Sequence, residues 1–270
     1  MILPRILTAI VLVLLVTFAI SYGGIFFMAL IAAIIMVCLY EYGLVLLLAQ
    51  KPVNRLGLIV FGALMTVAAL AGRLPDIVDL PSNISGFFIA LTLAGLFLFE
   101  MFRKAPSFER VINTFFGVML IPWCLAHLIN IRMIEPYGEY FTYIIFFAIW
   151  ANDTAAYAIG CWLGKHRLKE VVSPKKSWEG SIAGFVAGIG VTMLLWDMFY
   201  PNITWQQALA LGACISVLAQ VSDLAESLFK RHSGVKDTTG FLPGHGGFLD
   251  RFDACILTAP VIYYLVLFMI

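Results

Sequence analysis

Residues 25–49, IFFMALIAAIIMVCLYEYGLVLLLA, form an apolar run with a single charged side chain, that of Glu41. An α-helix needs about 20 consecutive, mainly apolar residues to cross the hydrocarbon core of a bilayer. The run is therefore long enough to span a membrane. Either it is one continuous helix, or a span is followed by a short interfacial helix that ends near Lys51.

The rest of the chain has the same character. Hydrophobic residues make up 62% of the 270 positions and charged residues 12%, whereas a soluble domain is about 25% charged. Apolar runs of membrane length are predicted at 6–21, 25–49, 56–72, 84–102, 111–131, 140–163, 180–199, 205–229 and 252–270. The sequence thus predicts an all-α polytopic integral membrane protein with about nine transmembrane helices. A net charge of +1 gives no indication of a nucleic-acid partner.

The positive charges lie in alternate loops. Short cytoplasmic loops are enriched in Lys and Arg, and nearly all of these residues fall on one side, at Arg5, Lys51, Arg55, Arg103, Lys104, Arg110, Lys165, Arg167, Lys169, Lys175, Lys176, Lys230, Arg231, Lys236 and Arg251. This bias predicts a cytoplasmic N-terminus and a C-terminus outside. It also predicts a multi-pass protein of a bacterial-type inner (cell) membrane.

We find neither internal repeats nor a low-complexity linker, so a single polytopic domain over 1–270 is predicted. In it, 1–135 would supply N-terminal membrane helices, and 136–270 the catalytic helices and cytoplasmic loops. Gly180, Gly184 and Gly188 place a small residue on one helix face every four positions, a pattern typical of close helix packing. Packing within the chain is the favoured interpretation, and a homodimer seam is the alternative.

Two polar segments interrupt the second half. Asp153 follows Asn152 inside the sixth apolar run, where a carboxylate is costly and indicates either a functional site or a structural hydrogen-bond partner. Residues 173–180, SPKKSWEG, lead directly into the seventh run. Two lysines beside a helix N-terminus can hold phosphate, although such a pair can also act only as a topology signal or a contact to anionic lipid.

The third polar segment, 223–253, is the most informative. Asp223, Glu226 and Lys230 lie on one helix face at i, i+3 and i+7. Asp250 and Asp253 are three residues apart in the first turn of the last predicted helix, so their carboxylates can point the same way. Hard oxygen ligands of this kind suit Mg²⁺, with phosphate oxygens completing its coordination.

This segment contains a distinctive set of residues: Ser227, Lys230, Arg231, Lys236, Asp237, Pro243, His245, Gly246, Gly247, Asp250, Arg251 and Asp253. Their order and spacing resemble the signature of the phosphatidate cytidylyltransferase (CDP-diacylglycerol synthase) family. The Asp153 segment and SPKKSWEG resemble further family features. The resemblance implies Mg²⁺-dependent transfer of CMP from CTP to phosphatidate, giving CDP-diacylglycerol and pyrophosphate, with a second cation such as K⁺ as a further candidate cofactor.

Our hypothesis for the site assigns roles residue by residue. Asp223, Asp250 and Asp253 are the candidate metal ligands, and Lys236 and Asp237 are further catalytic candidates. The candidates for contact with the substrates are Asp153, Ser173, Lys175, Lys176, Ser177, Glu179, Lys230, Arg231, His245 and Arg251. All the loops that hold these residues fall on the predicted cytoplasmic side.

Two other functions stay open at this stage. A transporter or channel could use Asp153, Asp223 and Glu226 as an ion or proton path near the membrane midplane. A different membrane enzyme could act on a lipid or polyprenyl phosphate, including a lipid-alcohol kinase that uses CTP. The first predicts carboxylates deep in several spans, whereas the charges here gather at one interface.

Overall fold

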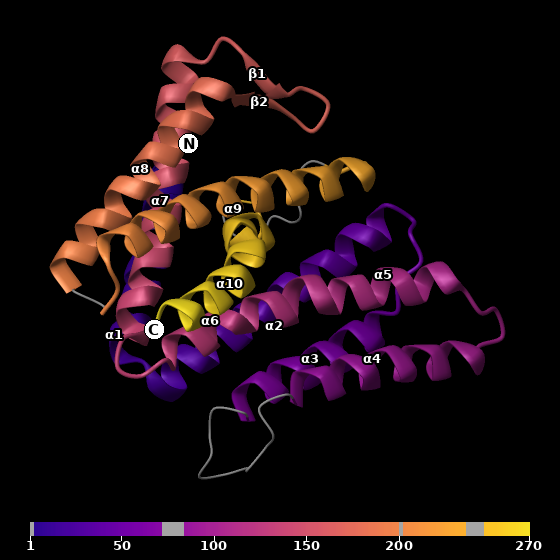
Figure 1. Cartoon of the computed structure of the whole chain (residues 1–270). Coiled ribbons are helices and arrows are strands. Elements are labelled where there is room, and N and C mark those ends of the chain that lie inside the picture. Colours follow the sequence, from indigo (N-terminus) through magenta and orange to yellow (C-terminus); the bar gives the residue numbers. More distant parts are fainter. Residues whose placement is uncertain (1–2, 72–83, 200–201, 236–245) are drawn as a thin grey trace. The chain divides into compact units, whose positions relative to one another are not determined.

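The computed structural model describes residues 3–71, 84–199, 202–235 and 246–270, and most of these are helical (Figure 1). In chain order the elements are α1 (Leu3–Tyr22), α2 (Gly24–Leu48), α3 (Arg55–Ala71), α4 (Ile84–Met101), α5 (Phe108–Val118), η1 (Met119–Trp123), α6 (Cys124–Arg132), α7 (Gly138–Leu163), β1 (Arg167–Lys169), β2 (Ser173–Ser177), α8 (Trp178–Phe199), α9 (Trp205–His232) and α10 (Leu249–Met269). A helix satisfies its own backbone hydrogen bonds, as a segment that crosses lipid must.

Seven helical segments among the described residues are long and apolar enough to cross a membrane: Gly24–Leu48, Ile84–Met101, Phe108–Arg132, Gly138–Leu163, Trp178–Phe199, Trp205–His232 and Leu249–Met269. Two shorter apolar helices are Thr8–Tyr22 and Arg55–Leu70. Each lies on a predicted apolar run, so the prediction of a polytopic helical membrane protein is confirmed. The number of spans and the orientation of the termini stay predictions.

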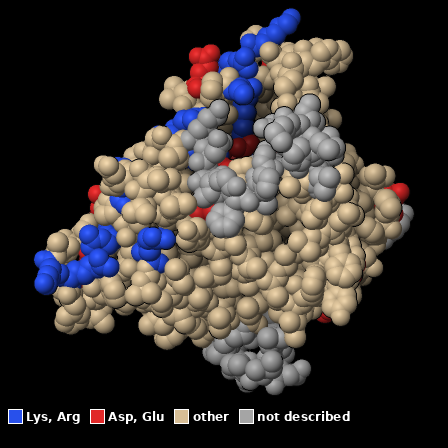
Figure 2. Space-filling model, turned by 180° about the vertical axis from the view of Figure 1, so that it is seen from behind, with Lys and Arg blue, Asp and Glu red and all other residues tan. Residues whose placement is uncertain are grey.

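The helix surfaces are apolar where a soluble protein would be charged. Large hydrophobic helix side chains such as Ile25 and Phe268 are 75% and 89% exposed. Figure 2 shows a face on which residues other than Lys, Arg, Asp and Glu cover most of the surface. Extended exposed apolar surface marks a membrane or partner interface. Contact with lipid accounts for it here.

The chain divides into two compact units. Unit 1 comprises Met1–Asn130 and His232–Arg251, and unit 2 comprises Ile131–Arg231 and Phe252–Ile270. The single polytopic domain stays a prediction.

Within unit 1, α2 is one continuous helix through Glu41, so the alternative of a span followed by an interfacial helix is wrong. At the far end of α4, the buried Glu100 accepts a hydrogen bond from the Ser107 backbone N–H (2.8 Å) and pairs with Arg110. The Ser107 hydroxyl in turn caps α5 by accepting from the Arg110 backbone N–H (3.3 Å). These contacts fix the turn between α4 and α5.

Within unit 2, the glycine stripe brings α8 against α7 (Figure 1). A Cβ atom at Gly180 would lie 2.6 Å from the Ala156 carbonyl oxygen, and one at Gly184 would lie 2.7 Å from the Asn152 carbonyl oxygen. Neither distance leaves room for a side chain. The prediction that the stripe packs within the chain is confirmed.

The link between α7 and α8 contains a structure that the sequence did not predict. Strands β1 and β2 pair antiparallel, with Arg167 opposite Ser177 and Lys169 opposite Ser173. The all-α prediction therefore omitted a small hairpin. Its strands are three and five residues long and mostly polar, so they lack the alternating apolar pattern that predicts a strand.

Candidate active site

Four carboxylates from three helices of unit 2 come together: Asp153 of α7, Asp223 and Glu226 of α9, and Asp253 of α10. The charges of Asp153, Asp223 and Glu226 all act on Asp253. Three of the four, Asp153, Asp223 and Asp253, are sequence-predicted site residues. Such a concentration of negative charge requires nearby cations to be stable.

Two lysines provide those cations within unit 2. The Lys176 ammonium group on β2 pairs with Asp223 Oδ2, and the Lys230 Nζ atom lies 2.5 Å from Glu226 Oε2. The two pairs differ in access: the Asp223 side chain is 34% exposed and that of Glu226 is 5% exposed. Lys176 and Asp223 are thus the pair that can exchange partners with a ligand.

The hairpin that carries Lys176 is anchored by Glu179 in the first turn of α8. The Glu179 carboxylate accepts hydrogen bonds from the backbone N–H groups of Lys165 (3.2 Å) and His166 (3.3 Å), and its Oε1 atom lies 2.7 Å from the His166 Nδ1 atom. The buried Ser177 hydroxyl accepts from the Gly180 backbone N–H (3.2 Å). Both predicted substrate contacts, Ser177 and Glu179, therefore have a structural role in placing β2.

The remaining predicted residues of unit 2 lie on the same hairpin or at the end of α9. Ser173 is half-buried at the start of β2, and Lys175 is exposed. The Lys175 carbonyl accepts a hydrogen bond from Arg167 Nη1 (3.3 Å). Arg231, at the end of α9, donates through Nε to the Val172 carbonyl (3.4 Å). Basic side chains from the hairpin and from α9 thus lie in one region.

A partly buried amide network, which the sequence did not reveal, holds α7, α8 and α9 together. Gln220 Nε2 donates to Asn152 Oδ1 (2.8 Å) and to the Ser181 carbonyl (2.9 Å). Asn152 Nδ2 donates to Asp153 Oδ1 (3.2 Å). Asn152 thus has the structural role considered from the sequence, while its neighbour Asp153 belongs to the carboxylate cluster.

Ser222 fixes α9 against α10 beside Asp223. Its hydroxyl donates to the Asp253 carbonyl and accepts from the Leu257 backbone N–H (3.1 Å). The hydroxyl therefore bridges the Asp253 carbonyl and the Leu257 N–H, which in a regular α-helix would hydrogen-bond directly to each other. This contact sets the register between the two helices that carry Asp223 and Asp253.

Asp250 precedes Asp253 by three residues in α10, and its surroundings belong to unit 1. Its Oδ2 atom accepts a hydrogen bond from the Gly247 backbone N–H (2.9 Å). Gly246 has φ +78°, and a Cβ atom there would lie 2.6 Å from the same oxygen. A glycine is therefore required for this turn. Arg251 is exposed, whereas Lys236, Asp237 and His245 lie outside the described residues.

The donor atoms suit Mg²⁺ in kind, because all four carboxylates of the cluster offer hard oxygen ligands. Within the ranges that the structure describes, no group of three Asp, Glu, His or Cys side chains is arranged closely enough to hold a metal ion. Beside Asp223, the Lys176 ammonium group provides the positive charge in this structure.

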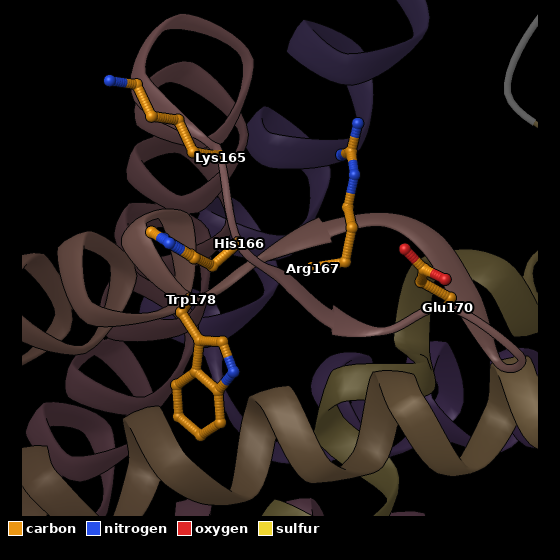
Figure 3. Close-up of a pocket in the computed structure, with 5 residues that line it drawn as sticks. All are labelled: Lys165, His166, Arg167, Glu170 and Trp178. Atoms are coloured by element: carbon orange, nitrogen blue, oxygen red, sulfur yellow. The ribbon is translucent and has the colours of Figure 1, made fainter.

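A recess of about 770 Å³ is lined by Lys165, His166, Arg167, Glu170 and Trp178. In Figure 3 these side chains diverge, and the Trp178 ring points away from Lys165 and Arg167. A ligand site normally has polar groups that converge on one point. We therefore assign the chemistry to the carboxylate cluster and not to this recess.

Several known proteins that this chain resembles are cytidylyltransferases by name. The model of the cytidylyltransferase family matches residues 3–269. The phosphatidate cytidylyltransferase of Staphylococcus saprophyticus is 31% identical over 236 residues, which cover 85% of this chain and 89% of that protein. The enzyme of the same name from Bacillus subtilis is 34% identical over 163 residues, covering 60% and 61%. The Synechocystis protein of that name is 43% identical over 136 residues, about half of either chain.

Proposed function

Because this chain belongs to the cytidylyltransferase family, whose members are nucleotidyltransferases, we propose that it is a phosphatidate cytidylyltransferase of phospholipid biosynthesis. It would transfer CMP from CTP to phosphatidate and release pyrophosphate, with CDP-diacylglycerol as product. The names of the relatives support the substrates. Family membership also removes the support for a transporter or channel.

The chemistry needs little acid–base help from the protein. A phosphate monoester has a second pKa of about 6 and is largely dianionic at neutral pH. An oxygen of the phosphatidate phosphate attacks the α-phosphorus of CTP. The bond from that phosphorus to the oxygen bridging the β-phosphate breaks, and pyrophosphate leaves with the electron pair. Since two polyanions must meet, catalysis would depend on positioning and charge neutralisation.

The observation that carries the proposal is the accessible pair of Lys176 and Asp223, in which Asp223 belongs to the carboxylate cluster. A substrate phosphate that reaches this pair can take Lys176 as its partner. Asp223 is then free to act as a metal ligand together with Asp250 and Asp253. A bound Mg²⁺ would neutralise phosphate charge and polarise the α-phosphoryl group. A second cation such as K⁺, forming a two-cation clamp, belongs to the same proposal.

The other site residues would bind the phosphates. Lys230 is held by Glu226, a member of the carboxylate cluster, and Arg231 is held by the hairpin. The further proposed contacts to the triphosphate and the lipid phosphate are Asp153, Ser173, Lys175, Ser177, Glu179, Lys236, Asp237, His245 and Arg251. Glu179 and Ser177 would act through the hairpin that they anchor.

We place the reaction on the cytoplasmic face of the inner membrane. The loops with the basic residues are those that the charge bias assigns to the cytoplasm, where CTP is available. Phosphatidate would enter sideways from the bilayer.

The proposal is tested by measuring pyrophosphate release from the purified protein in detergent. Release should require CTP, phosphatidate and Mg²⁺ together, and should be lost when ATP replaces CTP. Well-folded protein that releases no pyrophosphate with these three components would overturn the proposal. Activity with a lipid alcohol in place of phosphatidate would instead identify a lipid kinase.

A further inference from the structure

Glu41 is a buried carboxylate that the proposed mechanism does not use. It lies in α2, a 25-residue apolar helix of unit 1, and its exposed fraction is 0%. An ionised side chain in such a position is costly unless strong hydrogen bonds compensate for the lost water. The partners of Glu41 therefore indicate why the residue is there.

Both carboxylate oxygens of Glu41 bind the N-terminus of α10. Oε1 accepts from the Phe248 backbone N–H (3.1 Å), and Oε2 accepts from the Leu249 backbone N–H (2.8 Å). The first N–H groups of a helix have no partner within the helix, and the helix dipole adds positive potential there. Glu41 thus provides a charged cap for a helix that begins more than 200 residues later.

The same backbone turn binds Asp250. Gly247, Phe248 and Leu249 are consecutive, and each N–H donates to a carboxylate: the first to Asp250 and the next two to Glu41. The two acidic side chains therefore share one short stretch of donors. If Glu41 releases its two N–H groups, the turn that fixes the Asp250 carboxylate loses its anchor.

We infer that Glu41 is a positioning residue that orients Asp250 through the N-terminus of α10. The inference rests on the proposed function, in which Asp250 is a metal ligand. It assigns to the N-terminal half of the chain a defined part in the reaction, since α2 holds the turn that presents a ligand. Glu41 itself contacts neither substrate nor metal in this scheme.

The test is the Glu41→Gln variant, which keeps the shape of the side chain but removes its charge and one acceptor. Displacement of a reacting group by about 1 Å can cost about 100-fold in rate. We expect kcat to fall about 10- to 100-fold, while the KM for CTP stays within about threefold. The Mg²⁺ concentration for half-maximal activity should rise. Independently of activity, amide hydrogen exchange in a peptide covering 246–257 should become faster.

Glu100→Gln is the matched control. Glu100 is also a buried acid of unit 1 that accepts a backbone N–H, that of Ser107, at a helix end. Its loss should lower thermal stability without changing the Mg²⁺ dependence or the exchange of 246–257. A general loss of stability would affect both variants alike, whereas positioning affects only the variant at Glu41.

The outcomes separate the inference from the proposed function. Unchanged exchange of 246–257 together with an unchanged Mg²⁺ dependence in Glu41→Gln would overturn the inference. If Glu41→Gln fails to fold, Glu41→Asp keeps the charge on a side chain one methylene shorter. This variant should show the same two changes to a smaller degree, and their absence would also overturn the inference. If the unaltered protein transfers no CMP, the proposed function fails, and the exchange comparison still decides whether Glu41 orders the turn.

Discussion

At the residue scale, the carboxylate cluster contains two different ion pairs, an accessible one between Asp223 and Lys176 and a nearly buried one between Glu226 and Lys230. The side chains of Asp223 and Lys176 are about one-third exposed. A buried pair is expensive to break because one charge is left without a partner. The accessible pair can be exchanged for a ligand at much lower cost, so we expect its loss to affect turnover more than folding.

The first prediction concerns Asp223→Asn. The amide keeps the size of the side chain but removes the negative charge that a metal ligand needs. We expect kcat to fall by at least about 100-fold, as when an electrostatic contact to the transition state is lost, with expression and thermal stability nearly unchanged. Steady-state pyrophosphate release measures the effect. Near-normal turnover would remove Asp223 from the metal site.

The second prediction compares two neighbouring lysines on β2. Lys176 pairs with Asp223, whereas Lys175 is exposed. Lys176→Gln should lower kcat/KM by about 10- to 100-fold through the loss of a charged contact to phosphate. Lys175→Gln should have a smaller effect, visible mainly in the KM for CTP. Equal effects in the two variants would contradict the assignment of Lys176 to the reacting phosphates.

At the element scale, the packing of α8 on α7 positions the hairpin and Asp153 together. Gly184 leaves no room for a Cβ atom against the Asn152 carbonyl oxygen, whereas a Cβ atom at Gly190, on the same helix, would have no heavy atom within 4 Å. Substitution by alanine at Gly190 therefore changes only the helix propensity, whereas the same substitution at Gly184 also disturbs the packing of α8 on α7.

The third prediction follows from this contrast. Gly184→Ala should destabilise the protein by about 1–3 kcal/mol, because an atom is forced into a packed contact. Gly190→Ala should be neutral or stabilise it by up to about 1 kcal/mol through its better helix propensity. Thermal unfolding in detergent compares the two. A Gly184→Ala variant as stable as Gly190→Ala would show that the close contact does not exist.

The helices of this protein could be predicted from the sequence, whereas the hairpin and the long-range contacts could not. The membrane helices were predicted to within a few residues because the thickness of the bilayer sets the length of an apolar run. The hairpin was missed because its strands are short and polar. Glu41 was visible as a lone charge in α2, but its partners Phe248 and Leu249 depend on a contact across more than 200 positions. The sequence singled out Asp153, Asp223 and Asp253 as site residues, but it did not predict that Glu226 joins them or which side chains pair.

At the scale of the whole molecule, the charge bias makes a topology prediction that accessibility can test. In a variant whose five native cysteines are replaced, a cysteine at Lys169 should react only with a reagent admitted to the cytoplasmic side. A cysteine at Asn202, after α8, should react only from outside, since one membrane helix separates the two positions. Labelling of both from the same side would contradict the predicted orientation.

The central claim is that this membrane protein moves a cytidylyl group onto a lipid phosphate. The most direct measurement supplies the purified protein with phosphatidate, Mg²⁺ and CTP labelled at either the α- or the γ-phosphate, and follows the label into the lipid extract. The account predicts that the α-label enters the lipid and the γ-label leaves with pyrophosphate. Transfer of the γ-label to lipid, or of neither label, would contradict it.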